Sequence, residues 1–143
     1  MTRTGGVLGL HITTDKVVAE KRYDDLDAYQ CDVGCAGERC IIEPVTLRDG
    51  STMYVDEEGL YHGADPNSIA ADLAGLNGRP DLLLMGLRGD VVVVGPLDAD
   101  GNDTDVTDIV RRQVGRVGSE AGAVFLIAAD LAERTSVARW EGW

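Results

Sequence analysis

Long hydrophobic runs are missing from this 143-residue sequence. Its first apolar stretch, Val7 to Ile12, is interrupted by Gly9 and His11 and is far shorter than the roughly 18 to 20 residues of a membrane-spanning helix. We therefore expect no membrane association and a cytoplasmic protein. A chain of this length fits one domain, residues 1–143, that buries about two-thirds of its unfolded surface.

Cysteine and histidine are also scarce, with three and two residues. An odd number of cysteines within ten residues is not a disulfide framework. Cys31, Cys35 and Cys40 offer three thiolates for zinc, but no C-x-x-C pair is present, and His11 and His62 would have to come from distant strands. We predict small buried thiols on a helix and its exit, with no metal and no cofactor.

Catalytic and nucleotide-binding motifs are not found. The sequence has no Walker A loop and no G-x-G-x-x-G fingerprint, and GSEAG at residues 118–122 does not match G-x-S-x-G. The loop DADGNDTD fails as a calcium loop, because a frame starting at Asp98 places Asp103 where glycine is required and Ile109 where a bidentate glutamate is required. We predict no catalytic residue, a solvated loop before the next helix, and a role that is not enzymatic.

Positive charge is in short supply, and the formal net charge is −12. Residues 23–110 hold 19 acidic and 4 basic residues. This balance excludes a broad phosphate-binding face, because nucleic-acid binders need clustered Lys and Arg, so we expect no direct nucleic-acid binding. Two explanations of the acidity stay open. One is a GC-rich coding bias, since Arg outnumbers Lys and Asp outnumbers Glu; the other is mimicry of nucleic acid.

The first half of the chain alternates between strand and helix patterns. Apolar residues recur at every second position in residues 7–22 around the turn TTDK, which predicts a hairpin. Residues 26–33 have helical spacing behind Asp24 or Asp25 as a cap, and Gly34 is the predicted stop.

A second hairpin is predicted around Asp49-Gly50. The strand before it contains Pro44, which favours an edge position. A two-residue turn would split the apolar side chains between two faces, whereas a three-residue loop, Arg48–Gly50, pairs odd positions with odd ones and places Gly50 at the left-handed position. The loop of three gathers four apolar residues on one face: Val45, Leu47, Met53 and Val55.

The second half adds helices and a buried strand. Asp65 as cap, Pro66 as the first helical residue and a stop at Asn77-Gly78 with Pro80 predict one helix, with Ile69, Leu73 and Leu76 on one side. Two apolar runs follow, and the continuous Val91–Val94 is typical of a strand covered on both faces.

The C-terminal part is predicted to be helical. One helix carries Val106, Ile109, Val110 and Val117 on one stripe, with Asp108 in its first turn and three arginines (Arg111, Arg112, Arg116) towards its end, matching the helix dipole. A final helix is predicted over residues 119–134. The whole pattern has no strict βαβ repeat and predicts an α+β fold: a mostly antiparallel sheet of short strands and hairpins, packed by about four helices.

Three segments carry a family resemblance: YVDEEG (54–59), PNSIAADLAG (66–75) and GDVVVVG (89–95). In this order the sequence resembles a family of uncharacterised small domains found in phages, especially those of actinobacteria, and in mobile elements. The resemblance covers residues 12–101, with residues 102–143 as a helical C-terminal extension. It implies a phage-borne accessory protein in the bacterial host cytoplasm and carries no activity or catalytic residue.

Two surfaces remain as candidates for partner contact. One is the acidic turn Asp56, Glu57 and Glu58, where charges are normally solvated. The other is the tail VARWEGW, whose Trp140 and Trp143 are a residue type favoured as a binding anchor. We expect a protein that binds a host or phage protein, with a homo-oligomer also compatible. The alternatives are an acidic nucleic-acid mimic, such as an anti-restriction or anti-defence protein, and a small-molecule-binding domain or small enzyme with a cleft that the sequence does not reveal.

Overall fold

The computed structural model describes residues 6–33, 41–56 and 63–126. Within these segments the chain forms four helices and six strands. In chain order they are β1 (Val7–Ile12), β2 (Val17–Tyr23), α1 (Leu26–Asp32), β3 (Ile42–Thr46), β4 (Ser51–Asp56), α2 (Ser68–Leu76), α3 (Pro80–Met85), β5 (Val91–Pro96), α4 (Asp108–Ala121) and β6 (Val124–Leu126). The predicted α+β class is confirmed.

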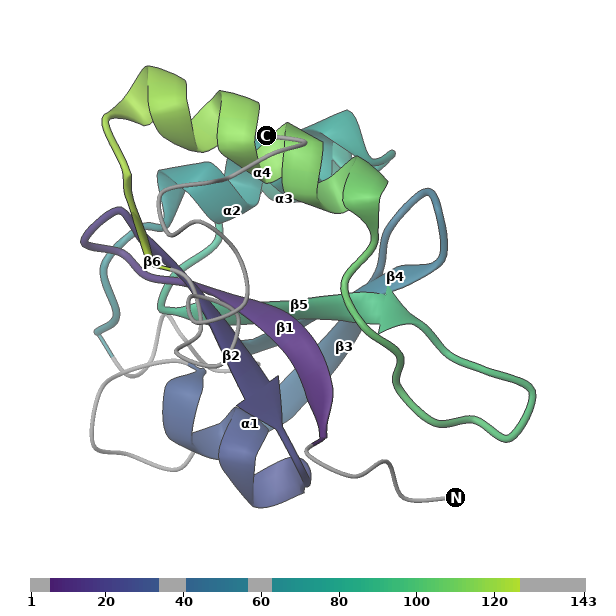
Figure 1. Ribbon diagram of the computed structural model, residues 1–143. Helices are drawn as coiled ribbons and strands as arrows, with labels where there is room; N and C mark the ends of the chain where they lie inside the picture. Colours follow the sequence, from purple (N-terminus) through teal and green to yellow (C-terminus); the bar gives the residue numbers. More distant parts are fainter. Residues whose placement is uncertain (1–5, 34–40, 57–62, 127–143) are drawn as a thin grey trace.

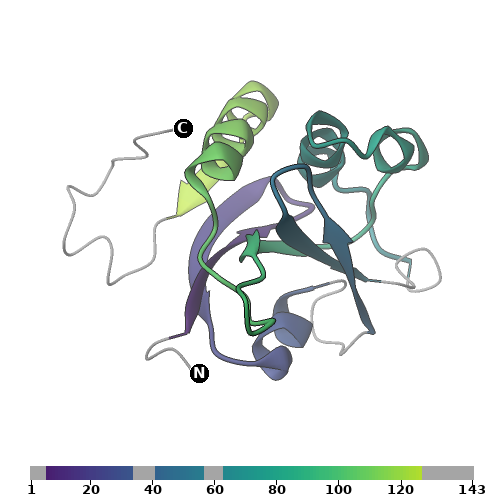
Figure 2. The same ribbon diagram turned by 90° about the vertical axis from the view of Figure 1, so that its right-hand side faces the viewer.

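All six strands belong to one open sheet in the order β3-β4-β5-β1-β2-β6. Neighbouring strands are antiparallel except β2 and β6, which run parallel. Helices α2, α3 and α4 lie over one face, and α1 lies against the other (Figures 1 and 2). The sheet is therefore the middle layer of the molecule. None of the helices in the described segments is long and apolar enough to cross a membrane.

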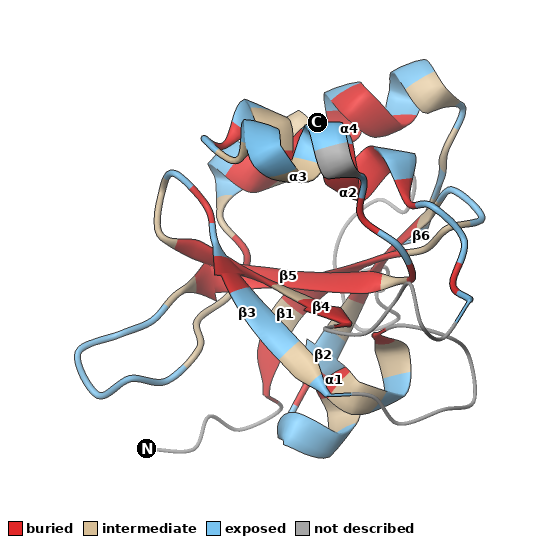
Figure 3. Cartoon of the chain, turned by 180° about the vertical axis from the view of Figure 1, so that it is seen from behind, coloured by how far each residue is buried: buried red, intermediate tan, exposed pale blue. Residues whose placement is uncertain are grey.

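The central strand β5 separates two hydrophobic cores. All four side chains of Val91–Val94 are fully buried, and Figure 3 shows β5 in red between the helical layers. Val91 and Val93 pack in the larger core with α2 and α4, whereas Val92 and Val94 pack in a smaller core beside α1. Because successive strand residues point to opposite faces, one apolar run serves both cores, as predicted.

The two predicted hairpins are confirmed. β1 pairs with β2, and β3 pairs with β4 in the predicted odd-with-odd register, with Val45 opposite Met53. The φ angle of Gly50 is +91°, in the region that glycine favours. β3 is an edge strand, as its proline indicates. The four residues predicted to share a face are all buried: Val45, Leu47, Met53 and Val55.

Helix α1 begins where one of the two predicted caps stands. The Asp25 carboxylate accepts a hydrogen bond from the Ala28 N–H at 3.0 Å, so Asp25 rather than Asp24 is the N-cap. The helix ends at Asp32. Its predicted stop, Gly34, lies outside the described residues.

The start of α2 differs from the prediction. Asn67 is the N-cap, not Asp65, and Pro66 forms an isolated β-bridge with Arg88 instead of the first helical turn. The reason is tertiary: the buried Asn67 side chain accepts from the Ala70 N–H and also donates to the carbonyls of Ile12 and Gly89. A carboxylate has no donor for those carbonyls.

The end of α2 follows the predicted signals except for the proline. Asn77 is the C-cap, and Gly78 has a φ of +85°. Pro80, however, opens the next helix, α3, in an apolar run for which the sequence pattern predicts no particular element. Proline suits this first helical position because a backbone N–H there has no partner within the helix, so its absence costs no hydrogen bond.

Helix α4 is anchored to the sheet by an ion pair between Arg111 and Glu20 of β2, whose side chain is buried. Asp108 lies in the first turn, as predicted. The predicted match of Arg111, Arg112 and Arg116 with the C-terminal dipole is wrong, because the helix continues to Ala121 and its last turn holds no basic residue.

The predicted helix over residues 119–134 is wrong at its start. α4 ends at Ala121, Gly122 takes the left-handed conformation with a φ of +79°, and Val124–Leu126 forms β6 beside β2. A Cβ built on Gly118 would meet the Phe125 ring at 2.9 Å, so the returning strand packs tightly under the helix. Residues 127–134 lie outside the described residues.

Candidate functional site

Three tyrosine rings form a stack on the α1 side of the sheet. Tyr23 ends β2, Tyr29 lies in α1, and Tyr54 lies in β4. The ring centroids of Tyr23 and Tyr29 are 5.0 Å apart, and those of Tyr29 and Tyr54 are 4.6 Å apart. These spacings fall within the range of favourable aromatic pairs. Three elements far apart in the sequence are thus joined by one aromatic cluster.

Each hydroxyl of the stack donates to a carboxylate. The Tyr29 and Tyr54 hydroxyls donate to Asp103, each at 2.8 Å, and the Tyr23 hydroxyl donates to Asp32 at 2.8 Å. The pKa of all three phenols is raised above its usual value. Burial is the largest cause, and the neighbouring carboxylates add to it. The phenols therefore stay protonated near neutral pH and serve as fixed hydrogen-bond donors.

Asp103 reaches the stack from the loop between β5 and α4. The loop folds on itself, because the Asp98 carboxylate accepts from the backbone N–H groups of Asp100 and Asn102 at 2.9 and 3.0 Å. Its far end is tied to β1, where the Leu8 N–H donates to the Asp105 carboxylate at 2.9 Å. The expectation of a merely solvated loop is wrong for Asp103 and Asp105, whose carboxylates hold other segments in place.

A cavity of about 380 Å³ opens beside the tyrosine stack. We call it the tyrosine pocket. The residues that line it include Tyr23, Tyr29, Tyr54, Asp24, Asp25 and Asp103. Gly6 also borders it, with a φ of +72°, and a Cβ there would meet the Tyr23 carbonyl oxygen at 2.5 Å. The volume is in the range of pockets that take small molecules or single side chains.

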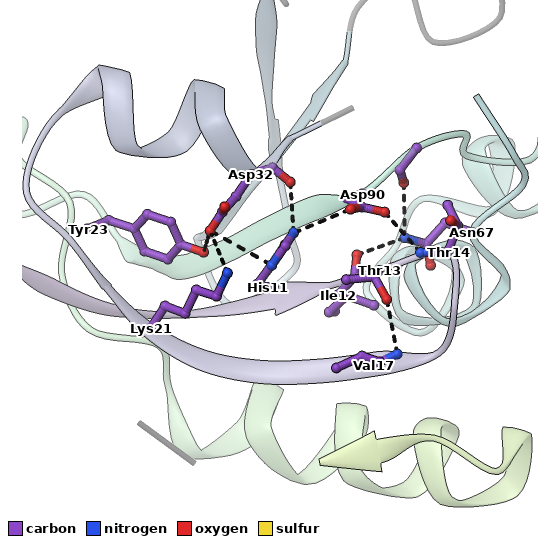
Figure 4. A network of polar contacts seen from close by, with 11 residues as sticks. His11, Ile12, Thr13, Thr14, Val17, Lys21, Tyr23, Asp32, Asn67 and Asp90 are labelled. Atoms are coloured by element: carbon purple, nitrogen blue, oxygen red, sulfur yellow. Dashed lines mark hydrogen bonds and ion pairs between the residues drawn. The ribbon is translucent and has the colours of Figure 1, made fainter. Parts of the chain in front are cut away.

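A second polar cluster adjoins the stack through Asp32 and is centred on His11 (Figure 4). The His11 Nε2 lies 2.8 Å from the Asp32 carbonyl oxygen, and since a carbonyl only accepts, Nε2 carries a proton. The same nitrogen is 3.5 Å from the Asp90 carboxylate, and Nδ1 is 3.8 Å from the Asp32 carboxylate. Lys21 also contacts the Asp32 carboxylate, at 3.2 Å.

This His11 cluster has a positioning role. His11 is buried in β1 and does not line the tyrosine pocket, while Asp90 also accepts from the Thr14 N–H at 3.0 Å. The cluster therefore ties α1, β1 and the start of β5 together. Because the Asp32 oxygen that contacts Lys21 also accepts from Tyr23, the cluster fixes one wall of the pocket.

Residues 7–117 match the family model described as a domain of unknown function, DUF3846. The chain belongs to the DUF3846 family. The match is longer than the predicted family-like region of residues 12–101 and includes most of α4. All three stacked tyrosines and Asp103 lie inside the DUF3846 region. Comparison with curated proteins and with solved structures gives no match.

The DUF3846 region contains only part of the predicted contact surface. Asp56 ends β4 and is buried, with only 7% of its surface exposed. Glu57 and Glu58 lie outside the described residues, as do Trp140 and Trp143 beyond the family match. Partner contact through the acidic turn and the tryptophan tail therefore stays a prediction.

The predicted cysteine arrangement is corrected at one position. Cys31 in α1 is an exposed free thiol, not a buried one, because it lies on the outer side of a helix that buries Tyr29. Cys35, Cys40 and His62 lie outside the described residues. Across residues 6–33, 41–56 and 63–126, no group of three His, Cys, Asp or Glu side chains is placed to hold a metal ion.

The tyrosine pocket is not predicted by the sequence patterns. Four tyrosines among seven aromatic residues were a usable signal, since tyrosine combines an apolar ring with a polar tip. Nothing local, however, indicates that Tyr29 and Asp103, 74 residues apart, share a hydrogen bond. The pocket exists only because the β5–α4 loop returns to the α1 side of the sheet.

Proposed function

We propose that this DUF3846 protein is a non-enzymatic accessory protein of a phage or mobile element that acts by binding a host or phage protein at the tyrosine pocket. The observation that carries the proposal is the state of the pocket's polar groups. Each of the three phenols already donates to a carboxylate, so the walls are held in one arrangement. A preformed pocket loses little conformational entropy when a ligand enters.

The composition of the walls also suits a protein partner. Tyrosine is enriched in protein interfaces because its ring buries apolar area while few torsions are frozen. The phage setting is supported by the sequence resemblance. The hydroxyls of Tyr29 and Tyr54 are engaged as donors to Asp103, which favours a receptor role for them over proton transfer.

The test is affinity capture with three forms of the full chain. Asn102 lines the pocket from an exposed position, so Asn102→Arg fills the opening and adds a positive charge. Ala99→Arg makes the same charge change at an exposed position of the same loop that does not line the pocket. Wild type and Ala99→Arg should recover the same protein from host or phage-infected lysate, and Asn102→Arg should lose it. A set of recovered proteins that is identical for all three forms would rule out the pocket as the binding site.

The cavity itself favours a second candidate, a small-molecule-binding domain. A volume of about 380 Å³ with converging polar groups is enough for a metabolite-sized ligand. The two candidates differ in the size of what binds. If the low-molecular-mass fraction of the lysate, separated by ultrafiltration, shifts the NMR signals of the pocket tyrosines and the protein fraction does not, the small-molecule function is correct.

A further inference from the structure

The charge of the tyrosine pocket is one-sided. Three of its lining residues are carboxylates, Asp24, Asp25 and Asp103, and among the described residues that line it none is Lys or Arg. Asp24 and Asp25 are exposed at the end of β2 and the start of α1, whereas Asp103 lies deeper beside the phenols. Hydrogen bonds from the phenols spread the charge of Asp103 but do not remove it. An anionic ligand would be repelled from this site.

The aromatic walls add a second preference. Tyr23 and Tyr29 are buried and stack on each other, and Tyr29 also stacks against Tyr54, so the partly exposed Tyr54 is the ring best placed to contact a ligand. A tyrosine ring attracts a cation on its free face and provides apolar contact for the carbon atoms that carry an organic cation. A small hydrated metal ion gains little from such walls, because it prefers oxygen ligands on several sides. The combination of rings and carboxylates suits a charged group at the end of a short alkyl chain.

We propose that the tyrosine pocket binds an organic cation, a guanidinium or ammonium group on an alkyl chain, with its charge against Asp24, Asp25 and Asp103. This inference rests on the proposed function, since it names the chemistry that enters the same pocket. The group can belong to an arginine or lysine side chain of a protein partner or to a free small amine. The size of the pocket, about 380 Å³, accommodates one such side chain.

The experiment is an NMR titration of the full chain carrying ¹³C-labelled tyrosine. The probes are N-acetyl-arginine-methylamide, the corresponding lysine compound, free agmatine, and N-acetyl-citrulline-methylamide as a neutral isostere. We expect the Tyr23, Tyr29 and Tyr54 signals to shift with at least one cationic probe, with a dissociation constant at least tenfold below that of citrulline. Preference for the amino-acid derivatives over agmatine indicates a peptide source, and the reverse indicates a free amine; either supports an organic cation.

A charge-neutral variant tests the role of the carboxylates. Asp24→Asn with Asp25→Asn removes two charges from exposed positions, and asparagine preserves the N-cap of α1. The expected affinity loss for the cation is about fivefold to tenfold, because exposed charge pairs are individually weak. The control, Asp65→Asn with Asp72→Asn, removes two exposed charges outside the pocket and should leave the affinity unchanged.

Equal binding of citrulline and the cationic probes, no binding of any probe, or equal loss in the variant and its control would overturn the cation assignment. The proposed function fails by a different result. If Asn102→Arg abolishes partner capture while cations show no preference over citrulline, the binding site stands and the cation assignment falls. If Asn102→Arg leaves capture unchanged, the proposed function falls even where a cation enters the pocket.

Discussion

The hydroxyl of Tyr54 in β4 donates a hydrogen bond to the carboxylate of Asp103 at 2.8 Å, although 49 residues separate them. The contact closes the β5–α4 loop over the α1 side of the sheet. The same carboxylate accepts from Tyr29 at 2.8 Å. The loop, the sheet and α1 are thereby joined at one acidic residue, and the tyrosine pocket lies beside it.

Removing the Asp103 carboxylate should therefore lower the free energy of unfolding more than removing one tyrosine hydroxyl. Tyr54→Phe deletes one hydrogen bond and should lower the free energy of unfolding by about 1 kcal/mol. Asp103→Ala leaves two hydroxyls without their acceptor and should lower it by roughly 2 to 3 kcal/mol. Urea denaturation checks both values. Asp100→Ala, exposed in the same loop, is the matched control and should change stability by less than about 0.5 kcal/mol; equal losses for the two aspartates would contradict the assigned role of Asp103.

The phenols should also resist ionisation in the folded protein. Burial, followed by the adjacent carboxylates, raises the pKa of Tyr23, Tyr29 and Tyr54 above the usual value of about 10. Above pH 10 the unfolded chain releases phenol protons that the folded chain keeps, so the folded state must lose stability as pH rises. The ¹³Cζ shifts of these three residues should stay at their protonated values at pH 10.5, while urea midpoints decline between pH 9 and 11. Ionisation of the three at the free-tyrosine pKa would show that they are not held as described.

Asn67 gives a test in which two similar side chains should behave differently. Its amide donates to the carbonyls of Ile12 and Gly89 at 2.9 and 3.0 Å, and Asn67→Asp would set a carboxylate against both. We expect a loss of about 3 kcal/mol or more in the free energy of unfolding, because a buried charge would face acceptors. Asp65→Ala, at the exposed position that sequence alone predicts as the cap, should change it by less than about 0.5 kcal/mol. A larger loss for Asp65→Ala than for Asn67→Asp would restore the original cap assignment.

The ion pair between Glu20 and Arg111 should show strong coupling. Arg111→Met removes the cation beside a buried carboxylate and should cost on the order of 3 kcal/mol of stability. Adding Glu20→Met should recover much of that loss, since the buried charge is then gone. A double-mutant cycle by urea denaturation measures the coupling. Additive losses from the two substitutions would mean that the pair does not anchor α4 to β2.

Local signals were enough for part of the fold. The β3–β4 register follows from Asp49-Gly50 and the alternation of Val45 and Met53, which are near in sequence and need no knowledge of the rest of the chain. For α1, local signals narrow the N-cap to Asp24 or Asp25, and the structure selects Asp25. The predictions were wrong where contacts between distant residues determine the local structure. Asn67 rather than Asp65 is the N-cap of α2 because its amide donates to carbonyls that are 55 and 22 residues away in the sequence.

The end of α4 shows a second kind of limit. The helix predicted over residues 119–134 rests on a helical spacing of apolar residues that begins at Val124 and Phe125, but Gly122 turns the chain and Val124–Leu126 pairs with the open edge of β2. Because β2 lies more than one hundred residues earlier in the chain, the spacing of apolar residues near Val124 gives no sign of this pairing. The tyrosine pocket could not be predicted for the same reason. Its walls come from β2, α1, β4 and the β5–α4 loop, which are far apart in the sequence.

The most direct test is the affinity of a captured partner for the wild-type chain, Ala99→Arg and Asn102→Arg, measured by isothermal titration calorimetry. If the partner enters the tyrosine pocket, Asn102→Arg should bind at least tenfold more weakly than wild type, while Ala99→Arg binds within twofold of it. Equal affinities for all three chains would contradict binding at the pocket.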